Sequence, residues 1–417
     1  MKRRQFVILH RYVGLVLASF LVIASLTGAL LVWYHELDQW INSQIMQIDS
    51  PSHSSQPLSP FALRDEVQAA FPSASVNWMM LQRTSSTDAA FFYIESGVVV
   101  DGNRVELEFD EVFVDPYSGE ILGGRKWGDI SQGLTNLMPF IYRLHDSLAL
   151  GTVGTWVFGI VALLWTITCF IGAYLTFPAS GRNREERREN NWWQRWRIAW
   201  KVRWHGGRYK VNYDLHRAGG LWPWFLLFIF AWSGVALSLN SEIYKPVMSG
   251  FMAFQENPLH ELTEPAMVKP HPDIGWEPGF KAAKQQLEKL ASEQHFQVVA
   301  FERFAYYPEE GVMKLMARTS RDINDLFGQT WIYVDAVTGD RIGFYLPTGE
   351  ASGDTFTTWI TTLHIARIWG LPYRILVTVL GILVIMLSVT GVLIWWRKRG
   401  ARKRSRALQR NKVVSAD

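Results

Sequence analysis

Four histidines stand at the ends of long apolar segments, and they form two matched pairs. The motif "LHRYVGL" recurs as "LHRAGGL", which relates His10 to His216, and "LHDSLALG" is similar to "LHIARIWG", which relates His145 to His364. Ionisable side chains at or within membrane segments are costly and usually mark a functional site. A single histidine could simply be hydrated at the boundary, but two matched pairs favour binding of a ligand.

The chemistry that suits these pairs is ligation of a b-type haem. Two imidazoles from different helices can hold haem iron axially without covalent links to the macrocycle. Cys169 is the only cysteine, which excludes covalent haem attachment through CxxCH and a cysteine-held iron–sulfur cluster. Zinc needs three or four ligands, and neither pair brings a clear third. We therefore expect His10 to pair with His216, and His145 with His364.

The neighbours of the first pair fit a bound macrocycle. Gly14 and Gly220 lie four residues after their histidines, on the same helical face, where a flat ring could approach the backbone. Close packing of membrane helices would use such glycines equally well. Arg11 and Arg217 follow the histidines directly, and each could bind a haem propionate or extend to the lipid headgroups as an anchor.

His35 is a reserve ligand for the second pair. It ends the first apolar segment, but its counterpart in the matching segment is Ser241, so it lacks the symmetry of the four histidines above.

Four apolar segments are long enough to cross a bilayer, which takes about 20 helical residues. They are Tyr12–Tyr34, Trp156–Phe177, Leu221–Leu239 and Ile375–Trp396. The first is a retained signal anchor, because it is too long for a signal peptide and no small-residue cleavage site follows it.

The charges predict the orientation of these segments. Residues 180–210 hold ten Lys/Arg and three acids, and the tail after Trp396 holds nine and one. The loops 35–141 and 241–360 carry five basic and fifteen acidic, and ten basic and seventeen acidic, side chains. The positive-inside rule places both termini in the cytoplasm and both loops outside. The basic isoelectric point comes from the inside segments, so it is no argument for nucleic-acid binding.

The loops also repeat, which indicates an internal duplication. "FVDPYSGEILG" matches "YVDAVTGDRIG", and each has turn residues between two β-like runs, as in a hairpin. A helical candidate precedes each hairpin, Phe61–Phe71 and Gly279–Glu293. The expected fold is therefore membrane α+β, with four transmembrane helices and two exported domains of a helix plus antiparallel strands.

The basic linker between the two repeats is rich in tryptophan. Trp193, Trp196, Trp200 and Trp204 would share one face of a helix, surrounded by Arg and Lys. This composition favours an amphipathic helix in the inner headgroup layer over a docking site for a cytoplasmic partner.

Together these motifs make the chain resemble the PepSY-associated transmembrane helix proteins, and within them the inner-membrane ferric-siderophore reductases of Gram-negative bacteria. The resemblance covers residues 1 to about 400 and implies two periplasmic PepSY-like domains and two b haems on His10, His145, His216 and His364. "LHDSLALG" departs from the pattern at His145, because it lacks the Leu-Pro that follows Gly370 in the motif of His364.

The resemblance sets the following domain boundaries. They are 1–35, N-terminus and first membrane helix; 36–143, first PepSY-like domain; 144–178, second membrane helix; 179–212, basic linker; 213–240, third membrane helix; 241–360, second PepSY-like domain; 361–397, fourth membrane helix; and 398–417, basic tail.

The implied activity is an electron relay that reduces ferric siderophore iron to Fe(II) in the periplasm. The chain has no dinucleotide fingerprint, so the electrons would come from a quinol or a separate reductase. The acidic balance of the loops favours a neutral or cationic chelate such as a ferric hydroxamate. The alternative is a non-enzymatic PepSY-domain regulator of periplasmic peptidases, which would give no reason for four matched histidines. A transporter ranks last, because few acids lie in the apolar segments.

The length of the second membrane segment poses a geometric problem. A straight helix from His145 to Phe177 would measure about 48 Å at 1.5 Å per residue, against a hydrocarbon core of about 30 Å. Either the outer haem lies above the membrane, or the chain bends near Gly151 and near Gly370-Leu371-Pro372.

Overall fold

The computed structural model describes residues 2–48, 56–178 apart from 84, 98, 101, 102 and 105, then 191–260 and 269–414. Part of the predicted basic linker, residues 179–190, and the last three residues of the tail lie outside the described residues. The chain forms two compact units, each described here by itself. The helical unit is Met1–Val32, Arg143–Lys245 and Leu371–Asp417, and the sheet unit is Trp33–Tyr142 and Pro246–Gly370.

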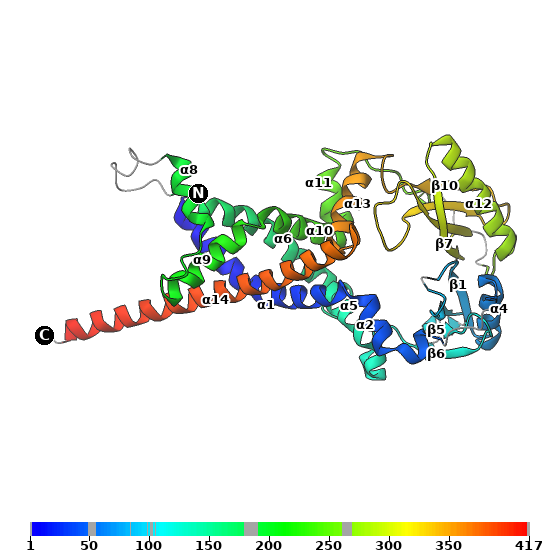
Figure 1. Cartoon of the computed structure of the whole chain (residues 1–417), viewed down its shortest axis with the longest axis horizontal. Helices are drawn as coiled ribbons and strands as arrows, with labels where there is room; N and C mark the ends of the chain where they lie inside the picture. The colour runs from blue at the N-terminus through cyan, green and yellow to red at the C-terminus, as the bar shows by residue number, and fades with distance from the viewer. Residues whose placement is uncertain are drawn as a thin grey trace. The chain divides into compact units, whose positions relative to one another are not determined.

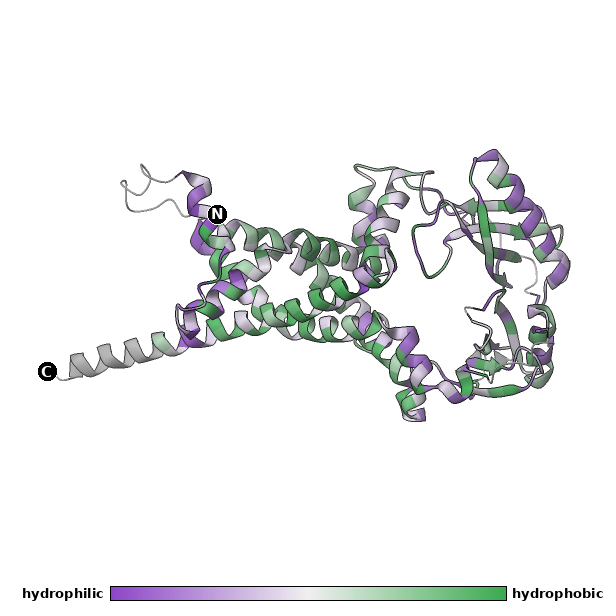
Figure 2. Ribbon diagram, in the orientation of Figure 1, coloured by the Kyte–Doolittle hydropathy of each residue, from purple (hydrophilic) through white to green (hydrophobic). Residues whose placement is uncertain are grey.

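In the described part of the chain, three helices are long and apolar enough to cross a membrane. They are α1 (Arg3–Leu31), α6 (Thr152–Thr176) and the first part of α14 (Gly370–Val414), up to Ala401. In the helical unit α6 packs against α1 and against α10 (Trp224–Ser238). Apolar residues predominate along these helices (Figure 2). The chain is therefore a membrane protein.

The third predicted membrane segment is bent rather than straight. Only Leu221 of the expected Leu221–Leu239 segment lies in α9 (Arg208–Leu221), whereas α10 holds most of it, and the axes of the two helices differ by 67°. Pro223 lies in the break. Because proline has no backbone N–H, it cannot donate the hydrogen bond that would continue the helix. The described residues thus hold three straight candidate spans, or four if the bent pair counts as one.

The chain also bends after His145, as one of the two sequence-based options required. The helix α5 (Leu137–Ser147) stops, and α6 begins at Thr152. Leu148, Ala149 and Gly151 between them have positive φ angles of 52°, 56° and 58°. Left-handed residues cannot continue a right-handed helix, so the long straight helix is avoided.

A matching break separates α13 (Ser352–His364) from α14. Ala366, Trp369 and Gly370 have positive φ angles of 55°, 58° and 62°. Pro372 follows in the first turn of α14, where proline is compatible with a helix.

The tryptophan-rich linker is not the single amphipathic helix that its spacing predicted. The structure has a short helix α8 (Trp192–Trp196), followed by the 3₁₀ helix η3 (Arg197–Trp200). Trp204 lies beyond both, in a turn before α9. The helical path ends before Trp204, because Lys201 has an extended backbone with a φ of −107° and a ψ of 142°. Trp204 therefore does not extend the face formed by the other tryptophans.

The sheet unit is built on one eight-stranded antiparallel sheet (Figure 1). Its order is β10-β9-β8-β7-β1-β2-β5-β6. The strands are β1 (Ala74–Met80), β2 (Ala90–Ser96), β5 (Glu111–Val114), β6 (Ile121–Arg125), β7 (Val298–Tyr307), β8 (Val312–Thr319), β9 (Thr330–Asp335) and β10 (Arg341–Tyr345), with β3 (Val99–Val100) and β4 (Asn103–Arg104) forming a separate ribbon.

The smaller helical elements complete the fold. They are α2 (Tyr34–Ile41), α3 (Ser43–Met46), α4 (Pro60–Ala70), η1 (Ile130–Gln132), η2 (Leu134–Asn136), the π-helix η4 (Asn240–Tyr244), α11 (Lys245–Met248) and α12 (Trp276–Glu293).

Both predicted hairpins are present, as β5–β6 and β9–β10. In each turn an aspartate, Asp115 or Asp335, accepts hydrogen bonds from the two backbone N–H groups two and three residues later. Gly119 and Gly339 close these turns with φ angles of 78°. The two hairpins lie at opposite ends of the sheet, which β1 and β7 join in the middle.

One face of the sheet is covered by α4 and α12, which are the two helices expected before the hairpins. Leu63 and Val67 of α4, and Leu287 and Leu290 of α12, pack into a common core with alternate residues of the strands. The strands alternate between this buried face and the opposite face, as their period of two requires.

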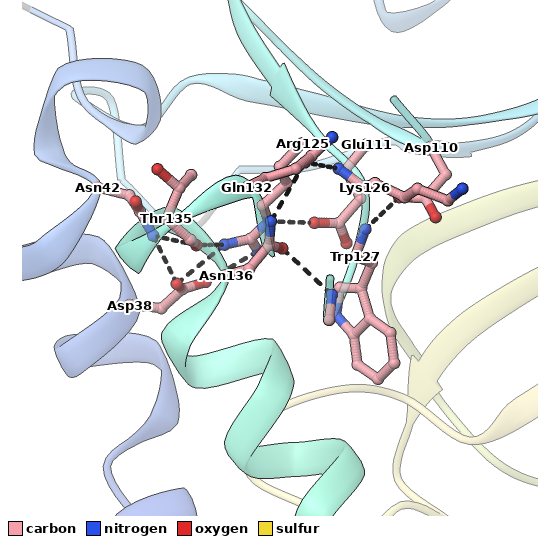
Figure 3. A network of polar contacts seen from close by, with 11 residues as sticks. Asp38, Asn42, Asp110, Glu111, Arg125, Lys126, Trp127, Gln132, Thr135 and Asn136 are labelled. Atoms are coloured by element: carbon pink, nitrogen blue, oxygen red, sulfur yellow. Dashed lines mark hydrogen bonds and ion pairs between the residues drawn. The ribbon is translucent and has the colours of Figure 1, made fainter. Parts of the chain in front are cut away.

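A buried ionic network ties α2 to the β5–β6 hairpin (Figure 3). Arg125 binds Asp38 through two guanidinium nitrogens, each at 2.9 Å, and Glu111 at 2.6 Å. Asp38, Glu111 and Arg125 are 1%, 3% and 4% exposed. Asn42 and the carbonyl of Thr135 complete the hydrogen bonding. Burial alone would lower the pKa of Arg125, but the two carboxylates raise it above its ordinary value, so this guanidinium stays charged.

Candidate functional site

A cavity of about 480 Å³ lies inside the helical unit. Its walls come from α1, α6, α9, α10 and α14, and most of them are apolar. Arg3, Arg11, Arg217 and Lys398 also line it, which gives the cavity several cationic groups. Cofactor sites typically occupy about 300–1,000 Å³, with mainly apolar walls and a few polar groups. The size and lining suit an apolar ligand that carries negative charge.

His10 and His216 both line this cavity, so the structure brings the first predicted pair together. Their ring centroids are 6.3 Å apart, and the ring planes meet at 62°. A metal ion bonded at about 2 Å to one nitrogen of each ring would separate the two centroids by about 6 Å. The two imidazoles are therefore spaced for one shared metal centre.

The surroundings of His216 fix which of its nitrogens faces a ligand. Its Nδ1 lies 3.0 Å from the carbonyl oxygen of Leu387 and 3.1 Å from Oγ1 of Thr390. A carbonyl only accepts, so Nδ1 carries the proton and donates it, and Nε2 keeps its lone pair. Metal-binding histidines are commonly oriented in this way. A Cβ on Gly391 would lie 3.1 Å from Cε1 of His216, so the glycine lets the ring lie flat against α14.

His145 is held in the same manner by α1. Its Nδ1 lies 3.0 Å from the carbonyl oxygen of Ala24 and 3.0 Å from Oγ1 of Thr27. A Cβ on Gly28 would approach its Cε1 to 2.9 Å. In both cases the carbonyl comes four residues before a glycine and the hydroxyl one residue before it.

His10 follows this pattern only in part. A Cβ on Gly172 would lie 3.3 Å from its Cε1, so its ring also lies against a glycine. The position before that glycine is Ile171, which has no hydroxyl. Among the described residues, the buried Nδ1 of His10 has no hydrogen-bond partner. This ring therefore lacks the hydroxyl contact that His145 and His216 have.

The two glycines predicted to admit a macrocycle both line the cavity. A Cβ added to Gly14 would meet nothing within 4 Å, so close helix packing does not explain this residue. A Cβ on Gly220 would lie 3.8 Å from Leu387, an ordinary contact. Gly219 is the packing residue of this motif, because its Cβ would come within 2.8 Å of Met386.

Arg11 and Arg217, the two arginines that follow the histidines of the cavity, differ in their contacts. Arg217 pairs with the buried carboxylate of Asp214 at 2.9 Å and donates to the carbonyl of Ile198. Arg203 binds the same carboxylate. Arg217 therefore anchors the linker to α9 with part of its guanidinium, although its Nε is buried without a partner in the described chain. Arg11 lines the cavity and has no ion pair among the residues described.

His364 ends α13 in the sheet unit, whereas His145 belongs to the helical unit. The pairing of His145 with His364 therefore stays a prediction. The reserve residue His35 lies in α2, also in the sheet unit. Within the described ranges, no group of three or more His, Cys, Asp or Glu side chains could hold a metal ion.

A family model of the PepSY-associated TM region matches residues 7–398. The chain belongs to this family. Among curated proteins no significant match to the chain was found. The match of this PepSY-associated chain spans all four histidines and both hairpins, so the family named from the motifs is confirmed.

A b-type haem, expected from the sequence, fits the cavity of this PepSY-associated protein on three counts. The two imidazoles are spaced for one metal centre, and His216 presents Nε2. Gly14 leaves open space beside the histidines. The apolar walls suit a porphyrin ring, and the cationic groups suit its carboxylates.

The sequence alone does not assign the groups that orient the imidazoles. Gly28, Gly172 and Gly391 occupy repeat-matched positions, but no motif places them against the histidine rings. The signal was the hydroxyl residue before the glycine in Thr27-Gly28 and Thr390-Gly391. Each contact crosses more than 100 residues, so no local pattern could have assigned it.

Proposed function

We propose that this protein is a di-haem inner-membrane reductase that passes electrons across the membrane to ferric siderophores and releases Fe(II). The observation that carries the proposal is the His10–His216 pair in its cavity, with the Nδ1 of His216 fixed by Leu387 and Thr390. A regulator or an anchor would have no use for an imidazole whose second nitrogen is kept free.

The role of each residue follows from its place in the cavity. His10 and His216 would hold the inner haem, which supplies one-electron chemistry when it is bound. Thr390 and the carbonyl of Leu387 orient His216 and make its Nε2 a stronger ligand for a metal ion. Gly14 leaves room for the macrocycle, and Arg11 would bind a propionate.

His145 and His364 would hold the outer haem in the same way. Thr27 and the carbonyl of Ala24 already orient His145 as a ligand would require. With cytoplasmic termini, the pair would lie toward the periplasm, where the siderophore is reduced. The electrons would enter from a quinol or a separate reductase on the cytoplasmic side.

We propose further that the chain is an internal duplication with two periplasmic PepSY-like halves. The strand order supports this, because β6-β5-β2-β1 and β10-β9-β8-β7 read the same from the two edges. The two aspartate-capped hairpins occupy equivalent places in this order.

The test is the absorption spectrum of the detergent-purified protein from haem-replete cells, oxidised and then reduced. We expect b-type bands on reduction and close to two haems per chain. The chemically reduced protein should be reoxidised by a ferric chelate, and an Fe(II) trap should then develop colour. A colourless protein would refute the proposal.

A different set of results would favour the alternative function, a PepSY-domain regulator. If the protein binds haem poorly, is not reoxidised by any ferric chelate, and binds a periplasmic peptidase tightly, the PepSY-domain regulator is the better description. His205→Ala is the matched control for variants of the four ligands, because this histidine lies in a turn outside the cavity.

A further inference from the structure

The face of the sheet opposite α4 and α12 is rich in aromatic and cationic side chains. The strand register places Tyr93, Trp78, Ala305, Lys314 and Tyr333 in one row across five neighbouring strands. A second row on the same face contains Met80, Arg303, Met316, Trp331 and Tyr345, and the ring of Phe91 contacts Trp78 and Tyr93 of the first row. Directly opposed residues of antiparallel strands share a face.

Two cations lie near the centre of this face, on the adjacent strands β7 and β8. Arg303 opposes Met316, and Lys314 opposes Ala305, so the two cations are diagonal neighbours. Lys314 is only 8% exposed. Neither cation forms an ion pair among the described residues, and the nearby Glu302 is bound to Arg318.

Two hydrogen-bond donors of this face lack acceptors in the part of the chain that the structure describes, although another nitrogen of Arg303 donates to the carbonyl of Gly328. The Nε of Arg303 and the Nε1 of Trp331 are buried without a partner. The ammonium of Lys314 lies 3.5 Å from the centroid of the Trp331 ring and 5.3 Å from that of Tyr333. An ammonium has three donors, and ring faces do not replace the acceptors that those donors need.

An arrangement of this kind is unfavourable unless an anion completes it. Burial and the charge of Arg303 lower the pKa of Lys314 to about 8, so the amine is still mostly protonated at neutral pH. Two neighbouring buried cations that form no ion pair among the described residues cost free energy, because charges are poorly solvated when buried. The missing component is therefore rich in acceptors and negatively charged.

The aromatic side chains on both sides indicate the shape of that component. Trp78 and Tyr93 contact at 5.0 Å between ring centroids, and Phe91 lies 5.0 Å from Tyr93. Trp331 contacts Tyr345 at 4.8 Å on the other side. Tyr93 is 37% exposed, so the face is open to solvent at this end. Exposed aromatic side chains stack well on flat rings.

We propose that this face of the sheet, with Arg303, Lys314 and Trp331 at its centre, binds an anionic chelate that carries aromatic rings. This inference rests on the proposed function, and there it makes the substrate a ferric catecholate. The overall acidic balance of the loops favoured a neutral hydroxamate, but the local charge at this face is positive. A catecholate supplies both the negative oxygens and the flat rings that the face lacks.

The test uses gallium(III) complexes, which resemble the ferric complexes but are not reduced under these conditions. Binding of the gallium complex of 2,3-dihydroxybenzoate to the full-length protein is followed by tryptophan fluorescence and by calorimetry. The neutral gallium complex of acetohydroxamate serves as the comparison ligand. We expect the anionic complex to bind at least about tenfold more tightly.

The variants separate this site from general electrostatic attraction. Lys314→Met should weaken binding of the anionic complex by about tenfold or more, since a charge-assisted contact is lost. Lys314→Arg should retain most of the affinity. Lys284→Met is the matched control, because Lys284 is an exposed lysine of α12, beside Glu288. It should bind like the wild type.

Each result bears on one proposal only. Equal binding of both complexes, or an unchanged affinity in Lys314→Met, would overturn the anionic site. Because gallium binding needs no electron transfer, such a failure would leave the haem spectra and the reoxidation by ferric chelates untouched. Conversely, a protein without haem could still bind the gallium catecholate.

Discussion

A graded series of glycine substitutions tests whether the imidazoles are held against the helices as described. Ala at Gly28, Gly391 or Gly172 places a Cβ at 2.9, 3.1 or 3.3 Å from the Cε1 of the facing histidine. To reach an ordinary contact of 3.4 Å, the ring must retreat by about 0.5, 0.3 and 0.1 Å respectively. Functional groups generally need placement within about 0.5 Å of their productive position.

The three variants should therefore differ in severity. Gly28→Ala reaches that limit and should lose most of the outer haem, with a loss of affinity of about 10- to 100-fold, as for disturbed metal surroundings. Gly391→Ala should retain the inner haem with reduced occupancy. Gly172→Ala should behave almost like the wild type.

The assay is the haem content per chain of the purified variants, together with the low-spin electron paramagnetic resonance signals of each haem. Alanine raises helix stability by about 0.5–1 kcal/mol over glycine, so a loss of haem cannot come from a weaker helix. Gly400→Ala is the control, because its Cβ would meet nothing within 4 Å and this glycine of α14 lies outside the cavity lining. Equal effects in all three variants, or the greatest effect at Gly172, would refute the reasoning.

Four further predictions concern single residues. His216→Ala should abolish one of two low-spin haem signals and leave the other, and loss of both or neither would contradict separate sites. Thr390→Val should keep the inner haem but weaken its binding about 10- to 100-fold, seen as faster haem transfer to apomyoglobin, because one acceptor of Nδ1 is removed. Arg125→Met should lower the free energy of unfolding by about 3–5 kcal/mol in urea titrations, because two buried carboxylates lose their cation; a change below about 1 kcal/mol would speak against the network. Folding lowers the pKa of Lys314 from 10.5 to about 8, so between these pH values the unfolded chain holds a proton on Lys314 that the folded chain has lost. The free energy of unfolding should therefore rise from pH 8 to 10.5, and thermal melting of Lys314→Met should lack this rise.

The sequence was sufficient for the features that depend on local patterns. Turn residues at fixed offsets located both hairpins, and Asp115 and Asp335 form the expected caps. Apolar length located the straight spans α1, α6 and α14. The repeated motif also predicted the pair His10 and His216, which line one cavity. Matched positions on matched helices lie at the same depth in the helical unit.

Features that depend on distant contacts were beyond the sequence. The composition of the third segment gave no sign of the 67° bend, since Pro223 is also tolerated at a helix start. Nor did any motif show that the two sets of strands form one sheet, because β1 and β7 pair through only a few residues far apart in the chain. The hydroxyls of Thr27 and Thr390 likewise acquire their role only when helices pack.

The pairing of β1 with β7 has a consequence for folding during synthesis. Met80 on β1 pairs with Arg303, and the chain between them includes α6, α9 and α10, which must be made first. At about 5–20 residues per second, synthesis leaves the β1 edge open for about 11 to 45 seconds. An unpaired edge strand is a template for association with other chains. During that interval the open β1 edge can pair with the same edge of a neighbouring copy, so closely spaced ribosomes on one message would favour association between copies.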